Sequence, residues 1–98
     1  MGNEHQQLRL RGLNDAGMGA VAEAMRVNHT VTHIDMCYNP KLTDVGGAKL
    51  LEVLSQNSIV TRIDAHTGND LLHPELIDLL VARAQKNATA FNEAHRPV

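Results

Sequence analysis

Five side chains of the types that bind metals or act in catalysis occur in two short stretches of the sequence. His33, Asp35 and Cys37 form one stretch, and Asp64 and His66 form the other. Three or four such groups converging tetrahedrally would hold zinc. A Cys–His pair is, in principle, a nucleophile with its base. Which of these reactions is feasible depends on the elements that position the side chains.

Both stretches lie in an internal repeat. Residues 28–35 recur as residues 57–64, shifted by 29 positions, and five of the eight positions are identical. Asp15-x-Gly17 and Asp44-x-Gly46 are separated by the same shift, and a further Asn-x-x follows at Asn87. Self-similarity at a fixed period of this length is the signature of a repeat architecture.

Each repeat unit predicts a short strand, a turn and a helix. In the second unit, Val31, Ile34 and Met36 have the spacing of a half-buried strand. A turn is predicted at residues 38–41. After it, four residues occupy one face of an amphipathic helix: Gly47, Leu50, Leu51 and Leu54. We expect Asn57 to close this helix in the left-handed conformation.

The first and third units repeat the pattern with different residues. The first predicts a helix whose inner face carries small or flexible side chains, namely Met18, Val21, Ala22 and Met25. In the third unit, Pro74 is expected at the first helical position. Leu76, Leu79 and Leu80 should line the inner face of that helix.

The sequence resembles leucine-rich repeats of the ribonuclease-inhibitor type, which have units of 28 or 29 residues. The matching residues are Val31, Ile34, Met36, Asn39, Leu42, Asp44, Gly46, Gly47, Ala48, Leu50, Leu51, Val53, Leu54, Asn57 and Val60. The resemblance implies an α/β leucine-rich-repeat solenoid of about three repeats, wound as a right-handed βα superhelix. A short parallel sheet would line its concave face and helices its convex face. It also implies that Asn39 satisfies backbone groups of the neighbouring turn, with Asn69 in the equivalent role in the third unit.

The expected domain organisation follows the repeats. Residues 1–7 form a polar N-terminal lead, and residues 8–87 form the repeat domain, with units at about 8–30, 31–59 and 60–89. Residues 88–98 are expected to be a polar C-terminal cap or a tail. The short polar lead is unsuited to cover the first strand, and an uncovered parallel edge strand favours pairing with a partner. Self-association through this N-terminal edge strand is therefore an expectation.

Side chains that alternate with the core residues should form three rows on the concave face. The rows are Gln7, His33 and Arg62; Arg9, Asp35 and Asp64; and Arg11, Cys37 and His66. Asp35 lies beside Asp64, and adjacent like charges destabilise a sheet unless something pairs with them. Three interpretations stay open: a solvated ladder neutralised by Arg9 and Arg62, a partner Lys or Arg bound between the carboxylates, or a metal site.

We expect a non-enzymatic protein–protein interaction module, part of a larger chain or assembly. Side chains on an open face splay apart, so we predict no catalytic site, no metal and no cofactor. The candidate partner-binding residues are Arg9, Arg11, His33, Asp35, Cys37, Arg62, Asp64 and His66. One alternative is a regulator of small GTPases, because the resemblance extends to Ran GTPase-activating proteins. The other alternative is metal binding on the concave face.

Composition limits the partners further. The formal charge is −2 and the pI about 6.3, which argues against nucleic-acid binding, since that requires a basic face. No apolar stretch approaches the roughly 18 residues of a membrane span, and no apolar segment typical of a signal peptide follows the N-terminus. We therefore expect a cytoplasmic protein that contacts neither nucleic acid nor membrane.

Overall fold

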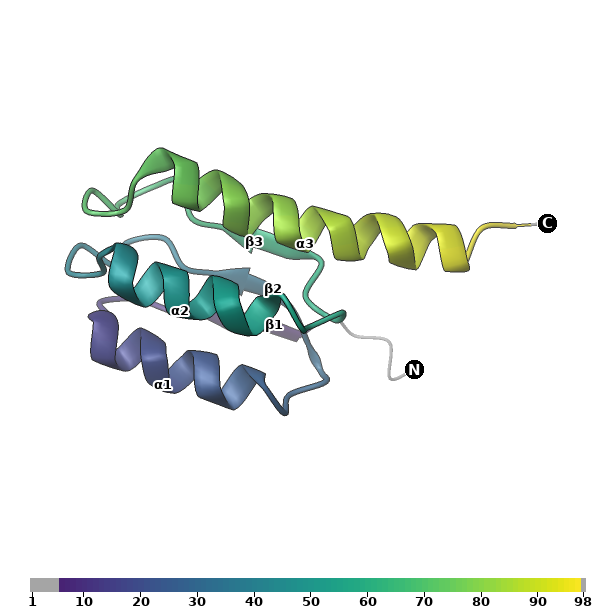
Figure 1. The fold of residues 1–98 in the computed structure, drawn as a ribbon, viewed down its shortest axis with the longest axis horizontal. Coiled ribbons are helices and arrows are strands. Elements are labelled where there is room, and N and C mark those ends of the chain that lie inside the picture. The colour runs from purple at the N-terminus through teal and green to yellow at the C-terminus, as the bar shows by residue number, and fades with distance from the viewer. Residues whose placement is uncertain (1–5, 98) are drawn as a thin grey trace.

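A computed structural model describes residues 6–97 and has an α/β fold in which strands and helices alternate. Each strand is followed by one helix (Figure 1). The elements are β1 (Gln6–Arg9), α1 (Asp15–Met25), β2 (Val31–Asp35), α2 (Asp44–Leu54), β3 (Arg62–Asp64) and α3 (Pro74–Ala94).

The three strands form a parallel sheet in the order β1-β2-β3. Leu8 pairs with Ile34, and Ile34 pairs with Ile63, so equivalent positions of successive strands lie side by side. The three helices lie on one face of this sheet (Figure 1). Among the described elements, contacts join neighbours only: α1 with α2, α2 with α3, β1 with β2, β2 with β3, and α3 with β3.

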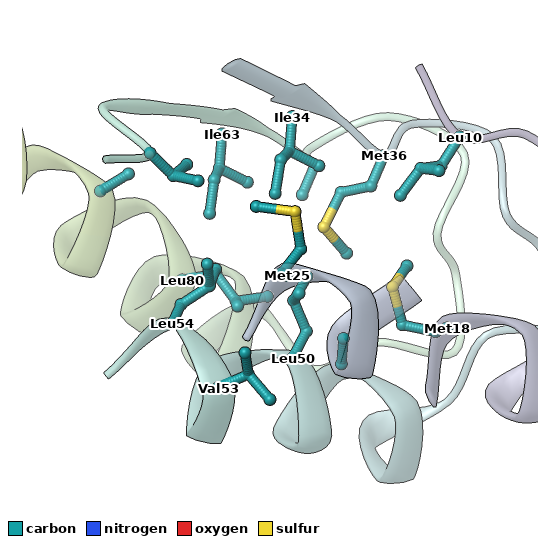
Figure 2. Packing of buried hydrophobic residues seen from close by; sticks show 14 of the residues in the cluster. Leu10, Met18, Met25, Ile34, Met36, Leu50, Val53, Leu54, Ile63 and Leu80 are labelled. Carbon is teal, nitrogen blue, oxygen red and sulfur yellow. The ribbon is translucent and has the colours of Figure 1, made fainter. Parts of the chain in front are cut away.

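The core lies between the sheet and the helices and is aliphatic (Figure 2). Ile34 and Met36 point from β2 and its exit toward Leu50 and Leu54 of α2, and all four are essentially inaccessible to solvent. Gly47 lies at the start of the α2 inner face, where an added Cβ would come within 2.8 Å of a Leu76 methyl group. The predicted strand and helix faces of the second unit are thus confirmed, with Leu51 half-buried at the margin.

The helix starts are tied to one another across the units. Asn14 caps α1 by accepting a hydrogen bond from Gly17 N–H, and Thr43 caps α2 through Val45 N–H. In addition, Asp15 in the first turn of α1 accepts hydrogen bonds from Thr43 N–H (2.8 Å), Thr43 Oγ1 (2.6 Å) and Gly46 N–H (3.1 Å). A carboxylate at a helix N-terminus satisfies unpaired donors and complements the helix dipole.

The same device recurs one unit later. Asp44, in the first turn of α2, accepts a hydrogen bond from His73 N–H (2.9 Å) and pairs with the His73 imidazole at the start of α3. Pro74 follows at the first helical position, as predicted. The shared 29-residue shift of Asp15 and Asp44 thus has a structural reason, because each carboxylate fixes the helix of the following unit.

One predicted core residue of α3 was placed wrongly. Leu79 is 55% exposed, whereas Leu80 is fully buried and Leu76 is half-buried. Ile77 takes the inner position instead, in a row that continues through Ala84. In the sequence, the helix face with Leu79 and the face with Ile77 and Leu80 are equally apolar. Contact with α2 and β3 determines that the second face is buried.

The predicted conformation of Asn57 was also wrong. The second helix ends at Leu54, and among residues 6–97 Tyr38 is the only non-glycine residue with a positive φ, at 64°. Asn57 instead accepts hydrogen bonds from the N–H groups of Ile59 and Val60, both at 2.8 Å. Its side chain therefore shapes the entry to β3.

The ends of the chain depart from the predicted boundaries. β1 begins at Gln6, inside the expected polar lead of residues 1–7, while residues 1–5 of that lead lie outside the described part of the chain. At the other end, α3 continues as a helix through residue 87 to Ala94. Within residues 6–97, none of the helices combines the length and apolarity needed to cross a bilayer.

Candidate interaction surface on the open face of the sheet

The face of the sheet opposite the helices carries the residues singled out in the sequence, and we call it the open face. Gln7 lies beside His33, and His33 beside Arg62. Arg9 lies beside Asp35, and Asp35 beside Asp64. The first two predicted rows are therefore confirmed in register. The side chains alternate with core residues because successive strand residues point to opposite faces.

Asp35 is held by a dense set of donors. Arg11 donates to both of its carboxylate oxygens, at 3.1 and 2.8 Å, a bidentate geometry that is stronger than a single charged contact. Cys37 N–H donates to Asp35 Oδ1 at 3.2 Å, and Arg9 Nε lies 3.7 Å from Oδ2. The hydrogen bonds from Arg11 lower the pKa of Asp35 well below its ordinary value, with the Cys37 N–H contributing in the same direction.

Asp64 has a different and more open set of partners. His33 Nε2 lies 2.7 Å from Asp64 Oδ2, and Arg62 Nε lies 3.5 Å from the same oxygen. The Asp64 side chain is 39% exposed, against 14% for Asp35. Arg9 and Arg62 do approach the two carboxylates as expected. The closest partners, Arg11 and His33, were not identified from the sequence. His33 lies diagonally within reach on the neighbouring strand, and Arg11 lies just beyond the end of β1.

A hollow of about 380 Å³ lies at the end of these strands. Six of the eight candidate residues line it, namely Arg11, Asp35, Cys37, Arg62, Asp64 and His66. Arg9 and His33 do not line it. The third predicted row therefore gathers at one place. Arg9 lies instead along the β1 strand and His33 within the β2 row.

Tyr38 is a residue of this hollow that the sequence-based list missed. Its ring is 55% exposed, and the Arg11 guanidinium lies 5.5 Å from the ring centroid, within range of a cation–π contact. Gly68 packs so closely that an added Cβ would lie 2.6 Å from Tyr38 Cδ1. The sequence did contain a signal for Tyr38, because it is one of only two residues of the Phe, Tyr and Trp types in the chain.

Buried asparagines fix the turns that carry the hollow. Asn39 is fully buried, donates to the carbonyl oxygens of Leu10 (3.1 Å) and Met36 (2.7 Å), and accepts from Leu13 N–H (2.7 Å). Asn69 repeats this arrangement by donating to Met36 and accepting from Asn39 N–H. The structural role expected of both residues is confirmed, and their hydrogen bonds fix the backbone conformation on either side of Tyr38.

The candidate metal-binding side chains do not converge on one point in the described part of the chain. Within residues 6–97, no group of three or more His, Cys, Asp or Glu side chains is placed to hold a metal ion. Cys37 is half-buried, and its backbone carbonyl accepts from Arg11 (3.0 Å). His66 is directed toward Asp78, 4.0 Å away on α3. What the surface does offer is exposed guanidinium groups beside one aromatic ring.

Searches of known protein families, curated proteins and solved structures found no match to this chain.

Proposed function

We propose that this chain is a leucine-rich-repeat module of the ribonuclease-inhibitor type, about three units of a right-handed solenoid. The nearest-neighbour contacts between elements support this reading, because in a repeat array each unit touches only the units beside it. The asparagine bonds that link successive turns and the Asp15 and Asp44 contacts between successive helix starts also support it. All three features recur at the period of the sequence.

We infer that the module is a non-enzymatic protein-interaction scaffold that binds through the open face. The carrying observation is the distribution of charge there. Asp35 is already paired within the chain, whereas the side chains of Arg9 and Arg62 are 67% and 69% exposed. Arginine and tyrosine are enriched among residues that dominate binding energy at protein interfaces, and Tyr38 lies exposed in the same hollow as Arg62.

The intrachain pairing alters the expected chemistry of the partner. A partner Lys or Arg between the two carboxylates has little to gain, because Arg11 occupies both oxygens of Asp35 and His33 engages Asp64. The exposed donors instead favour carboxylate groups on the partner, since a guanidinium binds a carboxylate through two parallel hydrogen bonds. The edge strand β1 provides a second, backbone-mediated route to association.

A charge-reversal series tests the interaction. The immobilised chain captures proteins from extracts of the cells that express it, in parallel with an Arg9→Glu/Arg62→Glu variant and a control. The control is Lys86→Glu/Arg96→Glu, which reverses two charges on the exposed side of α3 and its end. We expect the open-face variant to lose the captured proteins and the control to keep them. Identical capture by all three chains would contradict the proposal.

A further inference from the structure

The sheet has a second free edge, at β3, and it is bordered by a groove. The strand order leaves β3 with β2 as its single neighbour. A hollow of about 370 Å³ lies between β3 residues such as Arg62 and Asp64 and α3 residues such as Val81. A second hollow of about 480 Å³ is lined by Thr32 of β2, by the segment ahead of β3 and by the outer part of α3, including Phe91. Thr61 lines both hollows, so they meet at the start of β3.

The α3 side of this groove is one continuous helix face. Val81, Gln85, Ala88 and Asn92 line the two hollows and follow one another at intervals of three or four residues. The eleven residue steps from Val81 to Asn92 span about 16 Å, which is close to the length of a five-residue strand. Phe91, 54% exposed, closes the far end of this face. The groove is therefore long enough for a short added β-strand, part of which would pair with β3.

We propose that this groove binds the β1 strand of a second copy of the same chain, so that the sheet continues from one molecule into the next. β1 is the other free edge of the sheet, and Gln6, Gln7 and Arg9 are exposed along it. Leu10 N–H donates to Asp35 O. Because N–H directions alternate along a strand, those of Gln7 and Arg9 point to the free side. These two N–H groups can donate hydrogen bonds to carbonyl oxygens on the free edge of β3 in another copy.

Charge complementarity selects β1 as the occupant. Within one chain, Arg9 lies beside Asp35 in register. Continuing the same parallel register beyond β3 would place Arg9 of the second copy beside Asp64, whose side chain is 39% exposed. The row would then read Arg9, Asp35, Asp64, Arg9, with a guanidinium on each side of the two carboxylates. Gln7, which is uncharged, would lie beside Arg62, so no like charges meet.

The helix layer is compatible with the same stacking. Gly17 and Ala24 lie on the side of α1 opposite Asp15 and Arg26, two residues that contact α2. Such short side chains allow a neighbouring helix to approach closely. In the stacked arrangement this side of α1 would face α3 of the first copy, just as α2 faces α1 within one chain. Strand and helix of the first unit would thus both find a partner.

The proposed contact is head-to-tail, because β1 of one copy meets β3 of another. Such a heterologous contact does not close on itself in a pair, and it therefore adds copies progressively as concentration rises. It shares Arg62, Asp64 and His66 with the hollow at Tyr38, but Tyr38 and Arg11 take no part in it. Failure of this contact would leave the proposed open-face function standing.

Blocking one end at a time tests the direction of the contact. Ala88→Arg fills the groove on α3, and Thr89→Arg is its control, since Thr89 is exposed and lines neither hollow. Gln7→Pro removes an outward N–H from β1, and Gln7→Ala is its control. Circular dichroism melting verifies folding. Gln85→Arg replaces Ala88→Arg if that variant fails to fold. Gln7→Arg, which would place a second cation beside Arg62 of the neighbouring copy, replaces Gln7→Pro.

Sedimentation of the full chain over a range of concentrations gives the readout. The wild-type chain and both controls should rise in mean mass from the 10.7 kDa of one chain past that of two chains. Each blocked variant alone should stay at the mass of one chain, and their mixture should form two-chain species only, because one free end of each kind remains.

Three results would overturn the proposal. A wild-type chain that stays at the mass of one chain at every concentration would show that neither edge recruits a second copy. Association of Ala88→Arg alone would show a β1–β1 contact instead. A mixture of the blocked variants that forms no complex would show that β1 and β3 do not bind each other.

Discussion

At the scale of single residues, the open face is organised by Arg11. Its guanidinium bonds both oxygens of Asp35, reaches the carbonyl oxygen of Cys37 and lies against the ring of Tyr38. One side chain thus links the end of the sheet to the aromatic ring of the hollow. The repulsion between the adjacent carboxylates of Asp35 and Asp64 is offset mainly by side chains of the same chain.

Asp35→Asn should reduce the stability of the fold at neutral pH. Because the pKa of folded Asp35 is lowered, its carboxylate stabilises the fold above the ordinary Asp pKa of about 4 and loses that contribution as the pH falls below it. The wild-type chain and the variant should therefore converge in urea unfolding as the pH is lowered from about 5 toward 2. Asp64→Asn is the matched control, and an equal loss for both variants would contradict the role of Arg11.

Asn39→Ala should destabilise the fold. It leaves Leu13 N–H without its acceptor. The carbonyl oxygens of Leu10 and Met36 each lose one donor but keep Arg11 and Asn69, respectively. An unsatisfied buried group costs about 1–3 kcal/mol, so a loss of about 1–3 kcal/mol in the free energy of unfolding is expected. Asn92→Ala, on the exposed side of α3, should change it by less than about 0.5 kcal/mol. Similar values for both variants would contradict the bonding described for Asn39.

At the scale of elements, the helices are positioned by close contacts at their starts. Gly46 is packed against Leu42 of its own unit and Asp15 of the preceding unit. An added Cβ would lie 2.6 Å from Leu42 Cδ1 and 3.1 Å from Asp15 Cα. Gly19, in α1, has no atom within 4 Å of the equivalent position. The two glycines look alike in the sequence, yet one is required by packing and the other is not.

Gly46→Ala and Gly19→Ala should therefore change stability in opposite directions. Gly46→Ala should destabilise by about 1–3 kcal/mol, as overpacking does. Gly19→Ala should stabilise by about 0.5–1 kcal/mol, because alanine favours a helix and meets no obstacle. Thermal unfolding of the two variants gives the comparison. Stabilisation by Gly46→Ala would show that α2 does not approach Asp15 as closely as described.

Adjacent leucines of α3 provide a second contrast. Leu80→Ala should cost about 2–5 kcal/mol, which is a large share of the stability of a chain of this size. Leu79→Ala should cost less than about 0.5 kcal/mol, because this side chain is 55% exposed. Comparable losses in urea unfolding would mean that α3 is rotated relative to the sheet.

Periodicity predicted the elements well and their limits poorly. The 29-residue shift was sufficient to predict three strand–helix units and the register of Arg9, Asp35 and Asp64, because strand neighbours repeat position by position. The position of Leu79 and the length of α3 depend on tertiary contacts that periodicity does not encode. The hollow at Tyr38 was missed for the same reason, because the repeat pattern encodes neither the positive φ of Tyr38 nor the close approach of Gly68.

At the scale of the whole molecule, the described part of the chain is elongated, with principal extents of 46 × 25 × 21 Å. α3 extends beyond the sheet along the long axis (Figure 1). Helices cover one face of the sheet, while the open face and both edge strands are left without a covering element among residues 6–97. Both proposals follow from this asymmetry: a partner on the open face, and a second copy at the sheet edges.

Site-specific photo-crosslinking tests the central claim most directly. A benzophenone-bearing residue replaces Tyr38 on the open face or, as the control, Leu79 on α3, two side chains that are both about 55% exposed. After irradiation in the cells that express the chain, the account predicts a discrete heavier adduct from position 38 and none from position 79. Adducts of equal yield from both positions, or from position 79 alone, would contradict the assignment of the open face as the binding surface.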